Sequence, residues 1–263
     1  MSSTIRRLAT QSILPCIVFA LMLLGWEALV RINSIPAYVL PAPSLIGKTL
    51  VQDWDTLSSS LLVTLRITFS ALLAATIGGV ALAVLFAQWR WIERSFFPFA
   101  VILQVTPVIA IAPLLLVYLE PETAVLVCAF LVAFFPILSN TALGLASADH
   151  NLIDLFSLYH ASRWQQLIYL RLPSALPYFL GGLRIGGGLA LIGAIVAEIA
   201  AGSAGQGAGL AFRIVEAGFR LNIPRMFAAL TLISLTGILI YVILSVISWA
   251  MLSRWHESAR DKT

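Results

Sequence analysis

The most informative segment of the chain lies at residues 147–175 and reads SADHNLIDLFSLYHASRWQQLIYLRLPSA. It separates two apolar stretches, residues 124–146 and 176–200. Each stretch is long enough to cross a bilayer, which takes about 20 residues of helix. The segment is therefore expected to be a loop that joins two transmembrane helices and protrudes from the membrane.

The whole composition agrees with a membrane protein. The chain has 263 residues, of which 60% are hydrophobic and 11% are charged, and its mean hydropathy is +0.97. A soluble domain carries about 25% charged residues, so the composition excludes an ordinary soluble enzyme, a disordered protein and a nucleic-acid binder. The two cysteines, Cys16 and Cys128, lie in apolar stretches and predict neither a disulfide nor a metal site.

Six apolar segments predict an all-α membrane helix bundle that forms a single transmembrane domain of residues 1–263. The first segment continues into Trp26 and Glu27 without a small-residue cleavage site, so we interpret it as a retained span rather than a signal peptide. The predicted spans are residues 12–30, 61–87, 96–118, 124–146, 176–200 and 226–252, with a cytoplasmic loop at 147–175 and a periplasmic loop at 201–225.

The distribution of basic residues predicts that both termini are cytoplasmic. Nine basic residues fall in segments assigned to the inside and five in segments assigned to the outside. The inner set is Arg6, Arg7, Arg90, Arg94, Arg163, Arg171, Arg254, Arg260 and Lys262, and the outer set is Arg31, Lys48, Arg213, Arg220 and Arg225.

The 147–175 loop contains signals for two short helices. Asn151 is expected to cap a helix that begins at Leu152. Ser162 and Gln165 have the spacing of a capping box, and we expect the helix they open to end near Leu172, because Pro173 cannot donate a backbone hydrogen bond.

These two helices would meet at His160-Ala161 and form a bent element. Its apolar side chains either fold back onto the bundle or dock into a groove of a soluble partner. They are Leu152, Leu155, Phe156, Leu158, Tyr159 and Trp164.

The loop also carries a family resemblance. The order Asp154-Leu-Phe-x3-His160-x9-Leu170-x-Leu172-Pro173 resembles the Glu-Ala-Ala-x3-Gly-x9-Ile-x-Leu-Pro signature of type I binding-protein-dependent ABC importer permeases. Further landmarks resemble the branch that serves sulfonates, taurine and nitrate. They include Trp26-Glu27, Leu40-Pro-x-Pro-Ser44, Thr64-Leu-Arg66, Gly182-Leu-Arg184 and Ala197-Glu198.

The resemblance implies a multi-pass subunit of a bacterial cytoplasmic (inner) membrane that pairs with a second copy of itself. Two ABC ATPase subunits, which bind ATP and Mg, would drive it, and an extracytoplasmic solute-binding protein would deliver the solute. The solute would be a small anion such as a sulfonate, taurine or nitrate, or a pyrimidine or flavin vitamin precursor. The residues implied in ATPase coupling are Asp154, Leu155, Phe156, Tyr159, His160, Ala161, Ser162, Arg163 and Trp164.

The signature differs from the family pattern at the Glu position, at the two Ala positions and at the Gly position. Asp154 replaces Glu, and the bulky Leu155 and Phe156 replace two alanines, so the matching ATPase groove is expected to be wider. His160 stands where the family has Gly. If that position requires a positive φ, His160 adopts it at a cost of about 1 kcal/mol.

No nucleotide site of the chain's own is expected. Residues 42–49 approach the phosphate-binding loop pattern, but Ala42 replaces its first Gly, no strand precedes it, and the predicted topology places it outside the cell. The chain is expected to carry no cofactor, metal site or catalytic residue. Its three histidines, His150, His160 and His256, have no Cys or paired carboxylate near them, which argues against an intramembrane enzyme.

Polar residues inside the spans are the candidates for the transport pathway, because a charge in mid-bilayer costs about 2.5 to 3.5 kcal/mol. They are Gln104, Thr106, Asn140, Arg184 and Glu198. We expect Arg184 to extend toward the inner headgroups and Glu198 to line the pathway or form an interfacial pair. The candidate hinge or packing positions are Pro107, Pro113, Pro136, Gly186, Gly187 and Gly188.

The outer loop predicts an amphipathic helix over residues 211–221, ended by Pro224, with Glu216 positioned to pair with Arg220. Its polar face would be either solvated or in contact with the solute-binding protein. An alternative function for the whole chain is a self-contained secondary transporter, in which Arg184 or Glu198 would bind an ion.

Overall fold

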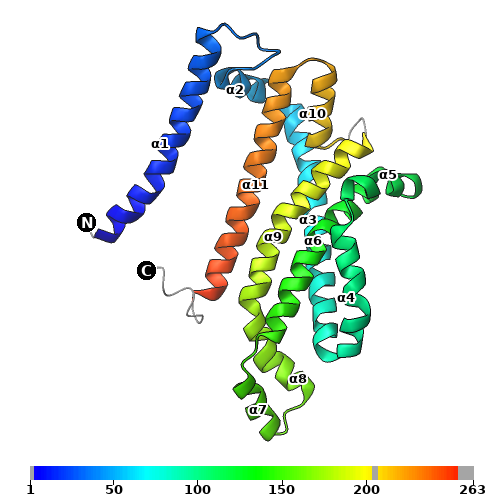
Figure 1. Cartoon of the computed structure of the whole chain (residues 1–263). Helices are drawn as coiled ribbons and strands as arrows, with labels where there is room; N and C mark the ends of the chain where they lie inside the picture. Colours follow the sequence, from blue (N-terminus) through cyan, green and yellow to red (C-terminus); the bar gives the residue numbers. More distant parts are fainter. Residues whose placement is uncertain (1–2, 203–206, 254–263) are drawn as a thin grey trace. The chain divides into compact units, whose positions relative to one another are not determined.

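A computed structural model describes residues 3–202 and 207–253, with side chains from residue 13 onward. Within these residues every regular element is a helix, which confirms the predicted all-α multi-pass class (Figure 1). In chain order the helices are α1 (Ser3–Ile32), α2 (Pro43–Gln52), α3 (Trp54–Gln88), α4 (Arg90–Val105), α5 (Val108–Tyr118), α6 (Pro121–Ala146), α7 (His150–Leu158), α8 (Arg163–Gln166), the π-helix η1 (Leu167–Arg171), α9 (Leu172–Ala201), α10 (Leu210–Phe219) and α11 (Ile223–Leu252).

Five helical segments of the described residues are long and apolar enough to cross a membrane. They lie in α1, α3, α6, the continuous helix Arg163–Ala201, and α11. A sixth candidate is the pair α4 and α5, which meet at a bend of 98°. The interruption expected at Pro107 is thus a complete break of the helix, because Pro107 lacks an N–H and Thr106 before it is extended.

The chain forms two compact units. The first, unit 1, contains residues up to 58 together with 213–232, and the second, unit 2, contains residues 59–212 and those from 233 onward. The predictions for Arg254, His256, Arg260 and Lys262 concern residues outside the described part of the chain, and those for Arg6 and Arg7 concern side chains outside it.

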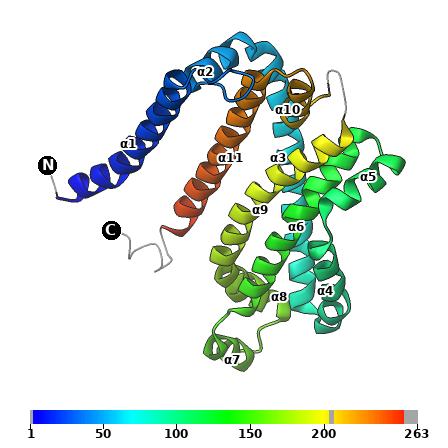
Figure 2. The same ribbon diagram turned by 45° about the horizontal axis from the view of Figure 1, so that its top comes forward.

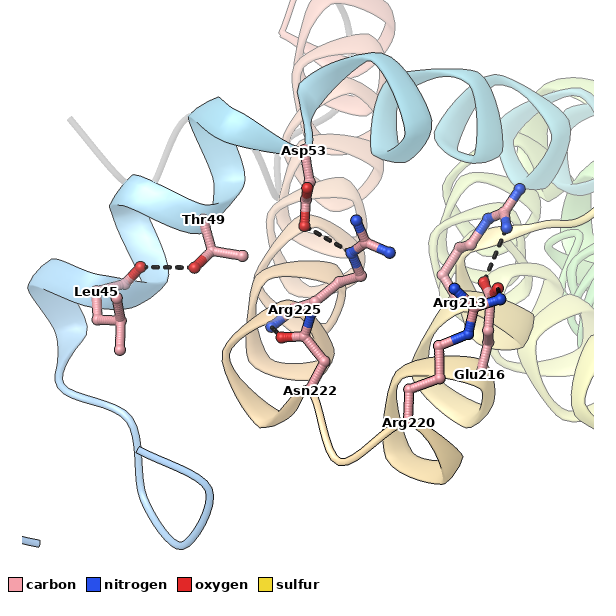
Figure 3. Close-up of polar contacts among 8 residues, drawn as sticks. All are labelled: Leu45, Thr49, Asp53, Arg213, Glu216, Arg220, Asn222 and Arg225. Carbon is pink, nitrogen blue, oxygen red and sulfur yellow. Dashed lines mark hydrogen bonds and ion pairs between the residues drawn. The ribbon is translucent and has the colours of Figure 1, made fainter. Parts of the chain in front are cut away.

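Unit 1 is held by ionic contacts between segments far apart in the sequence (Figure 3). The guanidinium Nε of Arg225 donates to a carboxylate oxygen of Asp53 at 2.6 Å. This hydrogen bond holds the pKa of Asp53 below its ordinary value of 3.8. Because the pKa of Asp53 is lowered in the folded unit, its ionised carboxylate stabilises the fold at any pH above the ordinary pKa. This stabilisation is lost as the pH falls through the lowered pKa.

Two landmarks of the sequence also meet in unit 1. The carboxylate of Glu27 in α1 accepts hydrogen bonds from the amide of Ser44, at 3.0 Å, and from its hydroxyl, at 2.7 Å. Arg31 donates to the same carboxylate at 2.6 Å. The end of α1 is therefore fastened to the first turn of α2.

The outer amphipathic helix is present as α10, and Glu216 pairs with both Arg213 and Arg220 at 2.9 Å. The hydrogen bond from Arg213 lowers the pKa of Glu216. The prediction that Pro224 ends this helix is wrong. Leu221 ends it with a φ of 54°, and Pro224 lies in the first turn of α11, where a missing N–H costs nothing.

Unit 2 is built around the pairing of α6 with α9, which run side by side in both views (Figures 1 and 2). Glycines allow this approach. A Cβ added to Gly182 would lie 2.8 Å from the Cβ of Asn140, and one added to Gly193 would lie 2.9 Å from the Cα of Ala129. At the foot of the pair, a Cβ on Gly144 would lie 2.8 Å from the Cα of Ala175.

The three predicted packing glycines of α9 have different surroundings. A Cβ on Gly186 would lie 2.9 Å from Ile137 of α6, and one on Gly187 would meet Leu244 of α11. A Cβ on Gly188 would meet nothing within 4 Å. Of the predicted hinge prolines other than Pro107, Pro113 lies inside α5 and Pro136 lies inside α6, which continues through it.

Two neighbouring glycines of α9 provide a test of this packing. Gly182→Ala should destabilise the detergent-solubilised protein by about 1 to 3 kcal/mol, because the new methyl group overpacks the α6 contact. Gly181→Ala, where a Cβ would meet nothing within 4 Å, should leave the stability unchanged or raise it by up to about 1 kcal/mol. Thermal melting compares the two variants. Equal melting temperatures would contradict the close α6–α9 contact.

Candidate functional site

The 147–175 loop forms a compact element at one end of unit 2, with α7 and α8 beyond the ends of α6 and α9 (Figure 1). Asp149, and not Asn151, caps α7: its carboxylate accepts the amide of Asn151 at 2.8 Å. The expected cap was therefore two residues too late. Both residue types cap helices equally well, so the sequence left the choice open.

The end of α7 explains the residue at the family's Gly position. His160 has a φ of 54°. Its amide donates to the carbonyl of Ser157 at 3.0 Å, and the amide of Ala161 donates to the carbonyl of Phe156 at 2.9 Å. These two bonds form a Schellman motif. The bend expected at His160-Ala161 is confirmed, and His160 occupies the left-handed conformation despite its side chain.

The capping box that opens α8 is confirmed. The amide of Ser162 donates to Gln165 Oε1 at 2.7 Å, and the amide of Gln165 donates to the Ser162 hydroxyl at 3.3 Å. The expected helix end near Leu172 is wrong, because the helix runs on from Arg163 to Ala201.

A π-helical turn carries the helix through Pro173. In η1 the amide of Leu172 donates to the carbonyl of Leu167, five residues earlier. The wider turn gives the proline ring space that an α-helical turn would deny it. The Ser174 hydroxyl donates to the carbonyl of Leu170 at 2.8 Å and so satisfies an acceptor in this turn.

The loop is anchored at its base and exposed at its tip. Leu167 and Leu170 are buried, and Leu167 packs in a cluster with Phe86 and Leu145. In contrast, none of the residues of α7 is buried. Leu158 is 76% exposed and Tyr159 is 81% exposed.

The exposed part of the loop also has a hollow of about 320 Å³. Five of the residues that line it are apolar or aromatic, and they come from both sides of the bend: Leu155, Phe156, Tyr159, Ala161 and Tyr169. Asp154, Ser162, Arg163 and Trp164 lie on the surface of the same element, and Ala161 is half-buried. The structure therefore brings all nine predicted coupling residues together in one protruding element.

Glu198 lies near the other end of α9 and is 4% exposed. Its carboxylate accepts the hydroxyl of Thr64 at 2.8 Å and the amide of Ala211 at 3.0 Å. The Thr64 hydroxyl accepts in turn from the amide of Leu210 at 2.9 Å, and Gly209 lies directly against the carboxylate. Glu198 and Thr64 thus cap the first turn of α10 from two other helices.

Arg184 lies twelve residues from the start of α9, about 18 Å along the helix. Its guanidinium carbon is 5.8 Å from the ring centroid of Tyr241 in α11, and its buried Nε has no hydrogen-bond partner among the described residues. Tyr241 precedes the end of α11 by eleven residues, which places the ring at a similar depth. The expected extension of Arg184 toward the inner headgroups stays a prediction, and the contact that the structure shows is with the ring of Tyr241.

The three uncharged pathway candidates do not meet one another. Asn140 donates to the carbonyl of Pro136 at 2.8 Å, and Thr106 donates to the carbonyl of Ile102 at 2.7 Å, so both serve their own helices. Gln104 is exposed on α4. Among the described residues, no group of three His, Cys, Asp or Glu side chains gathers as a metal site would require.

Comparison with known proteins places this geometry in a family. The model of the family described as the binding-protein-dependent transport system inner membrane component matches residues 75–253. The chain belongs to this permease family.

Individual relatives of this permease cover most of its length. The riboflavin transport system permease protein RibX of Chloroflexus aurantiacus is 34% identical over 92% of this chain and 90% of its own. The formylaminopyrimidine transport permease protein ThiX of Halalkalibacterium halodurans is 34% identical over 87% of this chain and 90% of its own. Permeases named for aliphatic sulfonates and nitrate are further relatives, at 27 and 29% identity.

A solved structure supports the fold. The crystal structure of an amino acid ABC transporter with histidines superposes with a TM-score of 0.63 at 16% identity, over 76% of this chain and 96% of the other. The predicted resemblance to ABC importer permeases, including the sulfonate and nitrate branch, is thereby confirmed.

Sequence reasoning gave no role to several residues that organise this permease. In the sequence, Thr64 is only part of the Thr64-Leu-Arg66 landmark, and no role is predicted for Gly209. A threonine within an apolar span was the available signal, since a buried hydroxyl requires a partner. The partner itself was not predictable, because Glu198 is 134 residues away in the sequence.

Two buried threonines one turn apart test the Glu198 cluster. Thr64→Val should lower the stability by about 1 to 3 kcal/mol, because it leaves Glu198 and the amide of Leu210 short of a partner. Thr68→Val should be neutral or stabilising, because the buried Thr68 hydroxyl has no hydrogen-bond partner among the described residues. Thermal unfolding in detergent measures both. A loss for Thr68→Val as large as that for Thr64→Val would contradict the cluster.

Proposed function

We propose that this chain is the transmembrane subunit of an ATP-driven importer, in which two copies form the pathway and two ATPase subunits supply the energy. The observation that supports this most is the 147–175 loop. It is a capped, rigid element with a buried base and an exposed apolar tip. Such a surface fits a groove in a soluble partner better than it fits the bundle, against which no residue of α7 is buried.

The docking surface of α7 explains how the bulky signature would act. Leu155 is exposed, whereas Phe156 is half-buried and lines the hollow next to Ala161. Compared with two alanines, Leu155 thus adds volume to the docking face, whereas Phe156 adds volume next to the bend. The partner groove would have to admit Leu155, Leu158 and Tyr159, and would be wider than one that receives alanines.

In the proposed cycle, ATP and Mg bind to the partner subunits and draw their surfaces together. The two loops follow, because each is held in its groove. Displacement of α8 passes into α9 without a break, since the helix is continuous from Arg163 to Ala201. The helices would then open the pathway to the outside, where the solute leaves the binding protein. ATP hydrolysis would return the pair to its starting arrangement.

The solute is proposed to be a small heterocycle of the flavin or pyrimidine class. This rests on the relatives: those named for riboflavin and formylaminopyrimidine are each 34% identical to this chain over the aligned residues, against 27 and 29% for those named for sulfonates and nitrate. The receptor would select the solute, and the polar face of α10 is the proposed contact for it.

The loop can be tested with single substitutions. Leu155→Asp and Tyr159→Asp should each abolish co-purification with the ATPase subunit and ATP-dependent uptake, because a desolvated carboxylate opposes docking in an apolar groove. Membrane levels should stay unchanged, since both side chains are exposed. Tyr38→Asp is the matched control: Tyr38 is also exposed, at 68% against 81% for Tyr159, but lies in a predicted outer segment, so the ATPase should co-purify as with the unmodified chain. Retained co-purification by both loop variants would remove the loop from the mechanism.

Reconstitution separates an ABC permease from a secondary transporter. Proteoliposomes that contain this chain, its ATPase and its binding protein should take up riboflavin or a pyrimidine only with ATP, and the chain alone should be inactive. Uptake by the chain alone under an ion gradient would contradict the proposal. ATP-driven uptake of taurine or nitrate instead would retain the permease function and overturn only the solute class.

A further inference from the structure

A basic cavity of about 450 Å³ lies at the end of unit 2 that carries the 147–175 loop. It forms where α3 turns into α4 and where α8 passes into η1, two regions that lie next to each other in both views (Figures 1 and 2). Arg90, Arg163 and Arg171 line it, together with Trp89 and Trp91. An adjoining hollow of about 420 Å³ shares Arg90 and Arg171 with it.

The charges of this cavity are not balanced within the described part of the chain. None of the ion pairs found there includes Arg90, Arg163 or Arg171. The adjoining hollow contains, besides the shared arginines, one carboxylate, that of Glu93, and the imidazole of His150. Three guanidinium groups that converge from three elements repel one another, so an anion in the cavity would relieve the repulsion.

The backbone adds to the same field. Arg90 is the first residue of the 16-residue helix α4, and Trp89, its N-cap, provides no side-chain hydrogen bond. The free amides of the first turn carry a partial positive charge. Arginine side chains and the free amides of a first helical turn both bind phosphate in proteins. A guanidinium group can donate two parallel hydrogen bonds to two oxygens of one phosphate.

The position of the cavity indicates what carries the phosphate. The turn at Trp89 joins α3, a candidate membrane span, to α4, the first half of the bent pair that is the sixth candidate, so we place it at the boundary between lipid and water. Trp89 and Trp91 are both exposed, and tryptophan is enriched at that boundary. Basic pockets between helices at the cytoplasmic side bind anionic headgroups. A water molecule occupies about 30 Å³, so the cavity has room for a phosphate group and the glycerol attached to it.

We propose that this cavity binds the phosphate group of an anionic phospholipid, held by Arg90, Arg163 and Arg171. The lipid joins the α3–α4 turn to the second half of the loop, because Arg90 begins α4, whereas Arg163 begins α8 and Arg171 ends η1. The bound headgroup thus braces the element that the proposed function assigns to ATPase docking, although the lipid site does not depend on that function.

Native mass spectrometry of the full-length protein in detergent tests the site. The unmodified chain should retain phosphatidylglycerol over phosphatidylcholine with the same acyl chains. Arg90→Gln and Arg171→Gln should each weaken phosphatidylglycerol binding by about five-fold, the effect of one basic residue near an anionic surface. Arg94→Gln is the matched control, because Arg94 follows Arg90 by one helical turn and lines neither hollow. It should leave lipid binding unchanged.

Three outcomes would overturn the proposal. They are equal retention of the two lipids, an equal loss in Arg94→Gln, and displacement of the lipid by excess inorganic phosphate, which would assign the cavity to a free phosphate instead. Should a glutamine variant fail to fold, Arg90→Lys and Arg171→Lys keep the charge but lose the paired hydrogen bonds. Their phosphatidylglycerol binding should be weaker than that of the unmodified chain and of Arg94→Gln, but some selectivity over phosphatidylcholine should remain. Phosphatidylglycerol binding as strong as in the unmodified chain would contradict the role of the arginines.

Discussion

The pairing of α6 with α9 is the contact on which the rest of unit 2 depends. Between membrane helices, lipid tails are as apolar as the side chains, so close packing has to supply the attraction. Gly182 and Gly193 provide it by letting the two backbones approach. Gly144 extends the contact to Ala175, where the chain leaves for the loop and returns from it. The loop therefore cannot splay at its base unless α6 and α9 separate.

The continuity of α9 gives this packing a mechanical meaning. The helix runs from Arg163 to Ala201 for 39 residues, about 58 Å, and the π-turn at η1 is what carries it through Pro173. At one end it carries the exposed tip of the loop, and at the other end Glu198 caps α10. In the proposed cycle, a movement of the loop would therefore pass along one continuous helix to the start of α10.

The charged residues within α9 are satisfied in different ways. Glu198 is enclosed by the hydroxyl of Thr64 and the amide of Ala211, as expected for a group that fixes structure. Arg184 contacts the ring of Tyr241 and keeps a buried Nε without a partner among the described residues. An unsatisfied buried donor is costly, so Arg184 is the better candidate for contact with a solute and Glu198 the better candidate for holding the pathway in shape.

Local chemistry determined much of this protein from the sequence alone. Hydropathy gave the helical membrane class, and the Ser162 capping box and the bend at His160 followed from backbone hydrogen-bonding needs close in the sequence. The tertiary structure decided the rest. The continuation of the helix through Pro173 and the enclosure of Glu198 by Thr64 depend on space and partners that other segments supply. A sequence shows which groups require a partner, but only the packed chain determines which distant groups lie within reach.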